Sequence, residues 1–107
     1  MSKKTTKEQK INIYIGLLKK DMKTKIKNKK VLNCVLNQFK EIGIDGFNVI
    51  KTIGYYKGQQ EPSLKFSFIN IFKIKTETIL KILEKLKKEL EQESILIEKE
   101  QIFYEFV

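Results

Sequence analysis

Apolar residues follow two different spacings along this chain, and the change between them marks out its secondary structure. The first alternation begins after Lys10: every second position is an isoleucine, at Ile11, Ile13 and Ile15. This spacing is typical of a strand with one buried face. Strand-like patterns recur at about residues 47–56, 63–72 and 95–107. We therefore expect four strands, of which the last is apolar on both faces.

Two segments between these strands have the spacing of an amphipathic helix. The first, residues 28–42, begins at the candidate cap Asn28 and stops before Gly43, and the second, residues 76–92, begins at the candidate cap Thr76. The apolar stripes are Val31, Val35, Phe39 and Ile42, widened by Leu32 and Leu36, and then Ile79, Leu83, Leu86 and Leu90. Each helix is therefore expected to bury one face.

The order strand, helix, strand, strand, helix, strand predicts an α+β, ferredoxin-like β-α-β-β-α-β fold. Such a fold has a four-stranded antiparallel sheet in the order 4-1-3-2, with two helices on one face and the fourth strand at an edge. Residues 10–107 are expected to form this single domain, after a flexible basic tail at residues 1–9. Residues 57–62, with a glycine and the only proline, are expected to form a hairpin loop.

Length and composition fit one small folded domain of 107 residues. No apolar run approaches the roughly 20 residues needed to cross a bilayer, so no membrane association is expected. The lone Cys34 cannot form an internal disulfide, which favours a reducing, cytoplasmic location.

Positive charge is concentrated at one end of the sequence. Residues 1–30 hold 11 lysines and two acids, whereas residues 31–107 hold 11 lysines and 11 acids. This asymmetry suggests attraction to an anionic nucleoprotein or protein partner, although lysines also serve simply to keep a small protein soluble. The candidate contacts are Lys19, Lys20, Lys23, Lys25, Lys27, Lys29 and Lys30, with Tyr55, Tyr56 and Lys57 at the hairpin tip.

Residue types common in catalysis are scarce. The chain has no histidine and one cysteine, so it lacks an ordinary proton shuttle and a soft metal cluster, and no glycine-rich phosphate loop precedes a helix. We therefore expect a protein that is not an enzyme and that uses no cofactor or metal.

Aromatic residues are predicted to lie on the sheet face that the helices leave open. If Ile69 and Ile71 share the buried face, Phe66, Phe68 and Phe72 lie outward beside Tyr14. Residues 13–18 and 66–71 resemble the strand-one and strand-three motifs of RNA recognition motif domains. That resemblance implies that Tyr14, Phe66 and Phe68 stack on RNA bases.

Burial by a second copy is the alternative explanation for exposed aromatics. The final strand, with Ile102, Tyr104 and Phe106, is also expected to be buried by a partner, because an exposed apolar edge strand promotes aggregation. Pairing of strand edges or of sheet faces in a homodimer would supply this burial, although the chain's own helices and hairpin could also cover these residues.

Two short segments carry a wider resemblance. Gly54-Tyr55-Tyr56-Lys57-Gly58 with Glu61 and Ser63, and Gln92-Glu93-Ser94-Ile95, are similar to small uncharacterised ferredoxin-like proteins of bacteria and phages. Size, basic arm and composition are also similar to phage-encoded inhibitors of bacterial defence, the anti-CRISPR proteins among them. That resemblance implies a binding protein that occupies a defence nucleoprotein, with RNA binding as the alternative.

Overall fold

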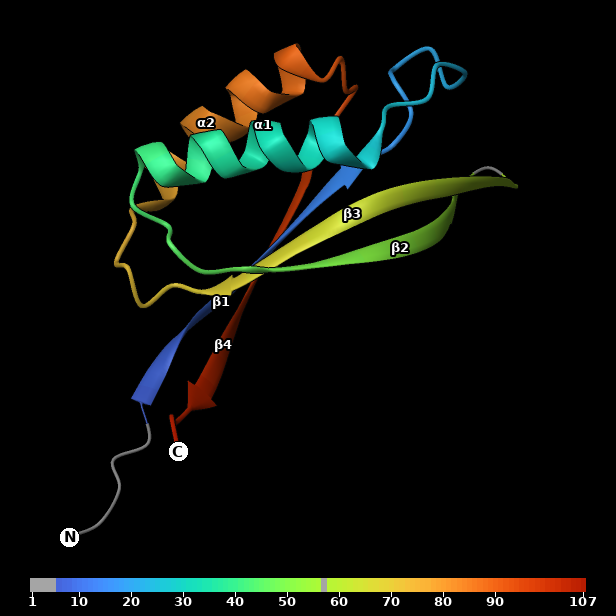
Figure 1. Cartoon of the computed structure of the whole chain (residues 1–107). Coiled ribbons are helices and arrows are strands. Elements are labelled where there is room, and N and C mark those ends of the chain that lie inside the picture. The colour runs from blue at the N-terminus through green and yellow to red at the C-terminus, as the bar shows by residue number, and fades with distance from the viewer. Residues whose placement is uncertain (1–5, 57) are drawn as a thin grey trace, which may run out of the picture.

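The computed structural model describes residues 6–56 and 58–107, and their six elements follow the predicted order (Figure 1). The elements are β1 (Thr6–Gly16), α1 (Asn28–Glu41), β2 (Asn48–Tyr56), β3 (Gln59–Ile69), α2 (Thr76–Glu89) and β4 (Leu96–Tyr104). The ferredoxin-like β-α-β-β-α-β fold is therefore confirmed.

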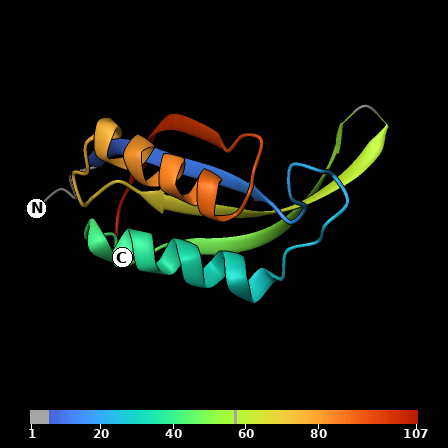
Figure 2. The ribbon, with the colours of Figure 1, turned by 90° about the horizontal axis from the view of Figure 1, so that it is seen from above.

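All four strands form one antiparallel sheet in the order β2-β3-β1-β4, which is the predicted order read from the other edge. Both helices lie side by side over the same face of this sheet (Figure 2). The opposite face carries no second layer among the described residues. β4 lies at one edge, as predicted, and β2 at the other.

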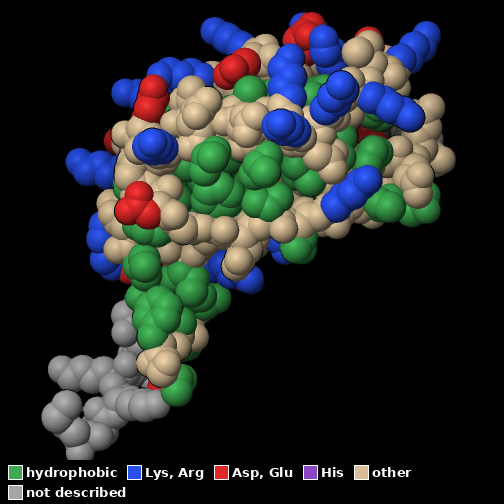
Figure 3. Space-filling view, in the orientation of Figure 1, with side chains coloured by type: hydrophobic (Ala, Val, Ile, Leu, Met, Phe, Trp, Pro, Cys, Tyr) green, Lys and Arg blue, Asp and Glu red, His purple; other side chains and the backbone are tan. Residues whose placement is uncertain are grey.

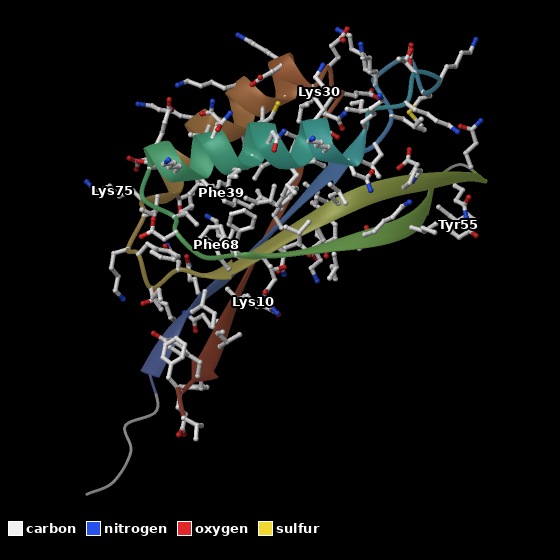
Figure 4. All side chains as sticks on the ribbon, in the orientation of Figure 1. Lys10, Lys30, Phe39, Tyr55, Phe68 and Lys75 are labelled. Carbon is white, nitrogen blue, oxygen red and sulfur yellow. The ribbon has the colours of Figure 1, made fainter. Side chains whose placement is uncertain are left out.

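The core lies between the helices and the sheet. Ile11, Ile13 and Ile15 of β1 are buried there, as their spacing predicted. The ring of Phe39 from α1 packs edge-on against the ring of Phe68, with 5.6 Å between centroids, and both rings lie between α1 and the sheet (Figure 4). From α2, the buried residues are Ile79, Ile82, Leu83 and Leu86, with Leu90 just beyond the helix.

The predicted exposure of the β3 phenylalanines is wrong. Ile13 pairs with Phe66 and Ile11 with Phe68, so these phenylalanines share the helix-covered face with the β1 isoleucines. Phe66 is fully buried and Phe68 nearly so, whereas Ile71, predicted to be buried, is 41% exposed. Because side chains alternate between the two faces of a strand, choosing the wrong parity reverses every assignment.

Element ends also differ from the predictions. β1 begins at Thr6, so residues 6–9, assigned to the flexible tail, pair with β4 instead. Lys27 and Lys75 occupy the N-cap positions without side-chain cap hydrogen bonds, so Asn28 and Thr76 are the first helical residues rather than caps. Leu32 and Leu36 are 37% and 47% exposed and do not widen the buried stripe of α1. Gly43 has the expected left-handed backbone, with φ +86°.

The hairpin between β2 and β3 is tighter than predicted, because Gln59–Pro62 already belong to β3. Pro62 is tolerated in this inner strand because β1 ends at Gly16, whose partner on β3 is Ser63. The carbonyl of Pro62 accepts a hydrogen bond from the Leu17 amide at 2.9 Å. The two strands of the hairpin thus extend past the end of β1 (Figure 1).

A search of the described residues for a helix that could span a membrane found none.

Candidate functional site

A large open groove of about 870 Å³ lies at the end of the sheet where β1 stops and the hairpin continues. Three segments far apart in the sequence form its walls: the end of β1 with the loop after it, the β2–β3 hairpin, and the connector from α2 to β4. The lining residues are Tyr14, Gly16, Leu18, Lys19, Lys20, Met22, Thr52, Ile53, Gly54, Tyr55, Glu61, Pro62, Ser63, Gln92, Glu93, Ser94 and Leu96.

Gln92 fixes the geometry of this groove. Its side chain is buried, and its Oε1 accepts a hydrogen bond from the Gly16 amide at 3.0 Å while its Nε2 donates to the Leu18 carbonyl at 3.0 Å. A Cβ added at Gly16 would lie 2.9 Å from that Oε1, so the glycine allows this close approach. One side chain thereby holds the connector against the end of β1.

The neighbouring Glu91 makes a second connection between the same segments. Its carboxylate lies 2.5 Å from the Lys19 ammonium, and its carbonyl accepts a hydrogen bond from the Lys20 amide at 2.7 Å. The hydrogen bond to Lys19 lowers the pKa of Glu91, and the same bond raises the pKa of Lys19. The loop after β1 is therefore held in place on the side that borders the groove.

Two carboxylates border the groove. Glu61 is half-buried on β3 opposite Gly54, and Glu93 is exposed in the connector. No lysine of the described residues lies within ion-pair distance of either carboxylate. They are therefore available to a cationic ligand.

Hydroxyl and apolar groups complete the lining. Thr52, Ser63 and Ser94 offer hydroxyls, and the Thr52 hydroxyl lies 2.6 Å from that of Ser63. Ile53 and Tyr55 are largely exposed and offer apolar surface at the hairpin. The groove thus combines negative charge, hydroxyls and apolar surface, a combination suited to a small cationic molecule with a polar and a flat apolar part.

Tyr14 is the only one of the four predicted stacking residues on the open face of the sheet. The Lys65 ammonium lies 5.6 Å from the centre of its ring, and a hydrogen bond with Glu98 raises the pKa of its hydroxyl. Phe72 is half-buried, with its ring centroid 6.3 Å from that of Phe68. Because Phe66 and Phe68 are in the core, the structure does not bring together the predicted base-stacking set.

The other predicted contact residues lie in different places. Lys19 and Lys20 border the groove, whereas Lys23, Lys25, Lys27, Lys29 and Lys30 are exposed farther along the loop and the first turn of α1. Tyr55 lies near the hairpin tip, 76% exposed (Figure 4). Tyr56 ends β2 beside it, and Lys57 lies outside the described residues.

The predicted edge contacts belong to β4 and the residues after it. Ile102 and Tyr104 are half-buried, Phe106 is 77% exposed, and the rings of Tyr104 and Phe106 meet edge-on at 5.6 Å. Exposed Phe103 and Phe106 leave apolar surface at this end of the molecule.

No protein-family model matches the sequence, and the search of curated proteins likewise found no match. Solved structures do match. Phage SAM lyase in its apo state has a TM-score of 0.73 at 19% identity, with 98% of this chain and 90% of that chain covered. Its complex with S-methyl-5'-thioadenosine has a TM-score of 0.71 at 20% identity, with 92% and 85% covered.

A PII-like protein matches as well. CPII, a nitrogen regulatory PII-like protein from Thiomonas intermedia K12 bound to ADP, AMP and bicarbonate, has a TM-score of 0.56 at 13% identity. The match covers 97% of this chain and 99% of that chain. The chain has the fold of phage SAM lyase and of this PII-like protein.

This likeness contradicts the prediction that the chain is not an enzyme, since phage SAM lyase is an enzyme of the same fold and similar length. The prediction rested on the absence of histidine, on the single cysteine and on the lack of a glycine-rich phosphate loop before a helix, which exclude only the chemistry that needs those features. Neither the fold nor the matches support or test the likeness to anti-CRISPR proteins, and the RNA-binding alternative also stays a prediction.

Sequence reasoning missed Glu61, Ser63, Glu93 and Ser94 as site residues. The signal was present, because the two segments that resemble small phage and bacterial proteins contain all four. In the structure, residues of both segments, which are well separated in the sequence, line one groove.

Proposed function

We propose that this chain binds S-adenosylmethionine in the groove and cleaves it to S-methyl-5'-thioadenosine, as a lyase. The observation that carries the proposal is a coincidence of two features. The fold likeness to phage SAM lyase extends over nearly the whole chain. The groove holds a half-buried carboxylate, Glu61, which has no ion-pair partner among the described residues and lies beside hydroxyls and apolar surface.

The charges of the groove are complementary to those of this substrate. S-adenosylmethionine carries a sulfonium and an ammonium, which Glu61 and Glu93 would attract, and a carboxylate, which Lys20 would attract. The hydroxyls of Ser63 and Ser94 are suited to the ribose, and Ile53 offers apolar surface to the adenine. Binding of adenine-containing ligands by phage SAM lyase and CPII supports a nucleoside site in this fold.

Cleavage of a sulfonium also suits a chain without histidine. When the bond between sulfur and the γ-carbon of the methionine part breaks, its electron pair moves to sulfur, and a neutral thioether leaves without needing a proton. A lyase adds no water, so the new bond to the γ-carbon comes from within the substrate: an oxygen of its own carboxylate attacks that carbon as the thioether leaves, which closes a lactone and releases no proton. The protein's task is then to bind and orient, which Glu61 would do.

Turnover of S-adenosylmethionine, followed by chromatography with mass detection, tests this function. We expect S-methyl-5'-thioadenosine to accumulate with the wild-type chain. Glu61→Gln should weaken substrate binding about tenfold or more, since a hydrogen bond to a charged group contributes about 1.5–3 kcal/mol. The matched control Glu105→Gln, at an exposed glutamate after β4, should be unchanged. A wild-type chain that neither binds nor cleaves the substrate would contradict the proposal.

We further infer that the chain forms a homodimer through the open face of the sheet. By strand register this face carries two lysines, Lys10 and Lys65, against four glutamates, Glu8, Glu61, Glu98 and Glu100, although the whole chain has a net charge of +9. Ile50 and Leu96 on this face are more than half exposed. In a two-fold dimer the lysines of one copy can face the glutamates of the other, so this mixed face brings two strongly basic chains together with less repulsion than their lysine-rich sides would.

A further inference from the structure

We call the segment from Leu17 to Lys30 the lysine loop. It joins β1 to the first turn of α1, and only two of its lysines, Lys19 and Lys20, line the groove. It holds seven lysines and a single acid, Asp21. Six of the seven lysines are exposed, and within the described part of the chain only Lys19 has an ion-pair partner within 4 Å. Lysine side chains are scattered over the upper part of the molecule, around this loop and the helices (Figure 3).

Buried side chains and backbone hydrogen bonds hold the lysine loop in a defined conformation. Leu17 and Ile26 are buried at its base, where the Ile26 amide donates to the Leu17 carbonyl at 2.8 Å. Farther out, the Lys19 amide donates to the Thr24 carbonyl at 2.8 Å. These hydrogen bonds hold the backbone from which the lysine side chains extend.

Asp21 organises the tip of the loop. Its Oδ1 accepts hydrogen bonds from the Lys23 and Thr24 amides, both at 2.8 Å, and its Oδ2 accepts one from the Thr24 hydroxyl at 2.5 Å. These bonds, chiefly that from the Thr24 hydroxyl, lower the pKa of Asp21 to about 2. The single acid therefore holds the turn in shape instead of pairing with the lysines.

The surface chemistry of the loop favours one class of partner. A protein–protein contact normally needs apolar or aromatic anchors, but the only large apolar side chain exposed here is Met22, at 37%. A phosphate backbone needs only positive charge, which lysine supplies without base specificity. The first turn of α1 contains no acidic residue to oppose it.

We propose that the lysine loop binds the phosphate backbone of nucleic acid without reading its sequence. The loop contains no arginine for bidentate contacts to bases and no aromatic ring for stacking. This activity goes beyond the proposed lyase function, whose substrate has a single carboxylate.

Binding of a labelled DNA duplex of about 20 base pairs, followed by fluorescence anisotropy between about 25 and 200 mM salt, tests the proposal. The triple variant Lys23→Gln, Lys25→Gln and Lys27→Gln should bind more weakly. Its logarithmic salt dependence should be shallower by about 0.9 for each phosphate that the loop no longer neutralises. All three lysines are exposed, so the far-ultraviolet circular dichroism spectrum should match that of the wild type and report an intact fold.

The matched control removes the same charge elsewhere, with Lys81→Gln, Lys85→Gln and Lys88→Gln on α2. It should keep the wild-type salt dependence. An equal weakening in this control would overturn the proposal, because net charge and not the loop would then govern binding. Absence of duplex binding by the wild-type chain at about 25 mM salt, or tighter binding to poly-L-glutamate than to the duplex, would also overturn it.

Discussion

At the scale of single residues, Gln92 has the most consequential set of hydrogen bonds near the groove. It bonds to Gly16 and Leu18 across more than 70 positions of sequence, and its Nε2 also donates to the Leu90 carbonyl at 3.2 Å. A glutamine three residues after the end of α2 looks like an ordinary solvent-facing residue in the sequence. Only the fold puts the end of β1 within its reach.

Replacing Gln92 by leucine should therefore destabilise the chain. The Gly16 amide and the Leu18 carbonyl would be left without their partner, and an unsatisfied group of this kind costs about 1–3 kcal/mol. Urea unfolding measures the decrease in stability, and Gln101→Leu, at an exposed position of β4, is the control. Equal stability of the two variants would show that Gln92 does not hold the connector.

At the scale of elements, the pairing of β1 with β3 decides which side chains form the core. Because Ile11 lies opposite Phe68 and Ile13 opposite Phe66, the two strands turn their bulky residues to the helices together. Phe39 of α1 fills the space above them, with its ring centroid 6.3 Å from that of Phe66. These rings therefore stabilise the fold and are inaccessible to RNA bases.

Phe68→Ala should accordingly lower the free energy of unfolding by about 3–5 kcal/mol, as expected for a large aromatic side chain removed from a packed core. Phe106→Ala, at a residue that is 77% exposed, should change it by no more than about 0.5 kcal/mol. Chemical denaturation of both variants measures the difference. A Phe68→Ala chain as stable as the wild type would contradict the placement of this ring in the core.

At the scale of the whole molecule, the charges are divided between the two sides of the sheet. The helices and the lysine loop carry most of the lysines, while the open face holds more glutamates than lysines and two exposed aliphatic residues. Tyr14, Thr52, Ser63 and Leu96 line the groove and lie at open-face positions. A second copy on this face would therefore border the groove.

Ile50→Glu should shift the chain from dimer to monomer, because it places a charge in the apolar part of the open face. Leu80→Glu, at a residue of α2 that is 45% exposed, should leave the assembly unchanged. Sedimentation velocity distinguishes the two states. A wild-type chain that sediments as a monomer at all concentrations would exclude the homodimer.

The sequence by itself determined the order of the elements, the helix stripes and the β1 core face, because the spacing of apolar residues records which side of an element is buried. The alternation of Leu64, Phe66 and Phe68 with Ser63, Lys65 and Ser67 also indicates the buried face of β3, but the prediction placed the buried face on Ile69 and Ile71, and Ile71 lies beyond the end of the strand. The sequence could not show that Glu61 and Glu93 share a groove. That arrangement depends on where β1 ends against the hairpin and on the long-range bonds of Gln92, which exist only in the folded chain.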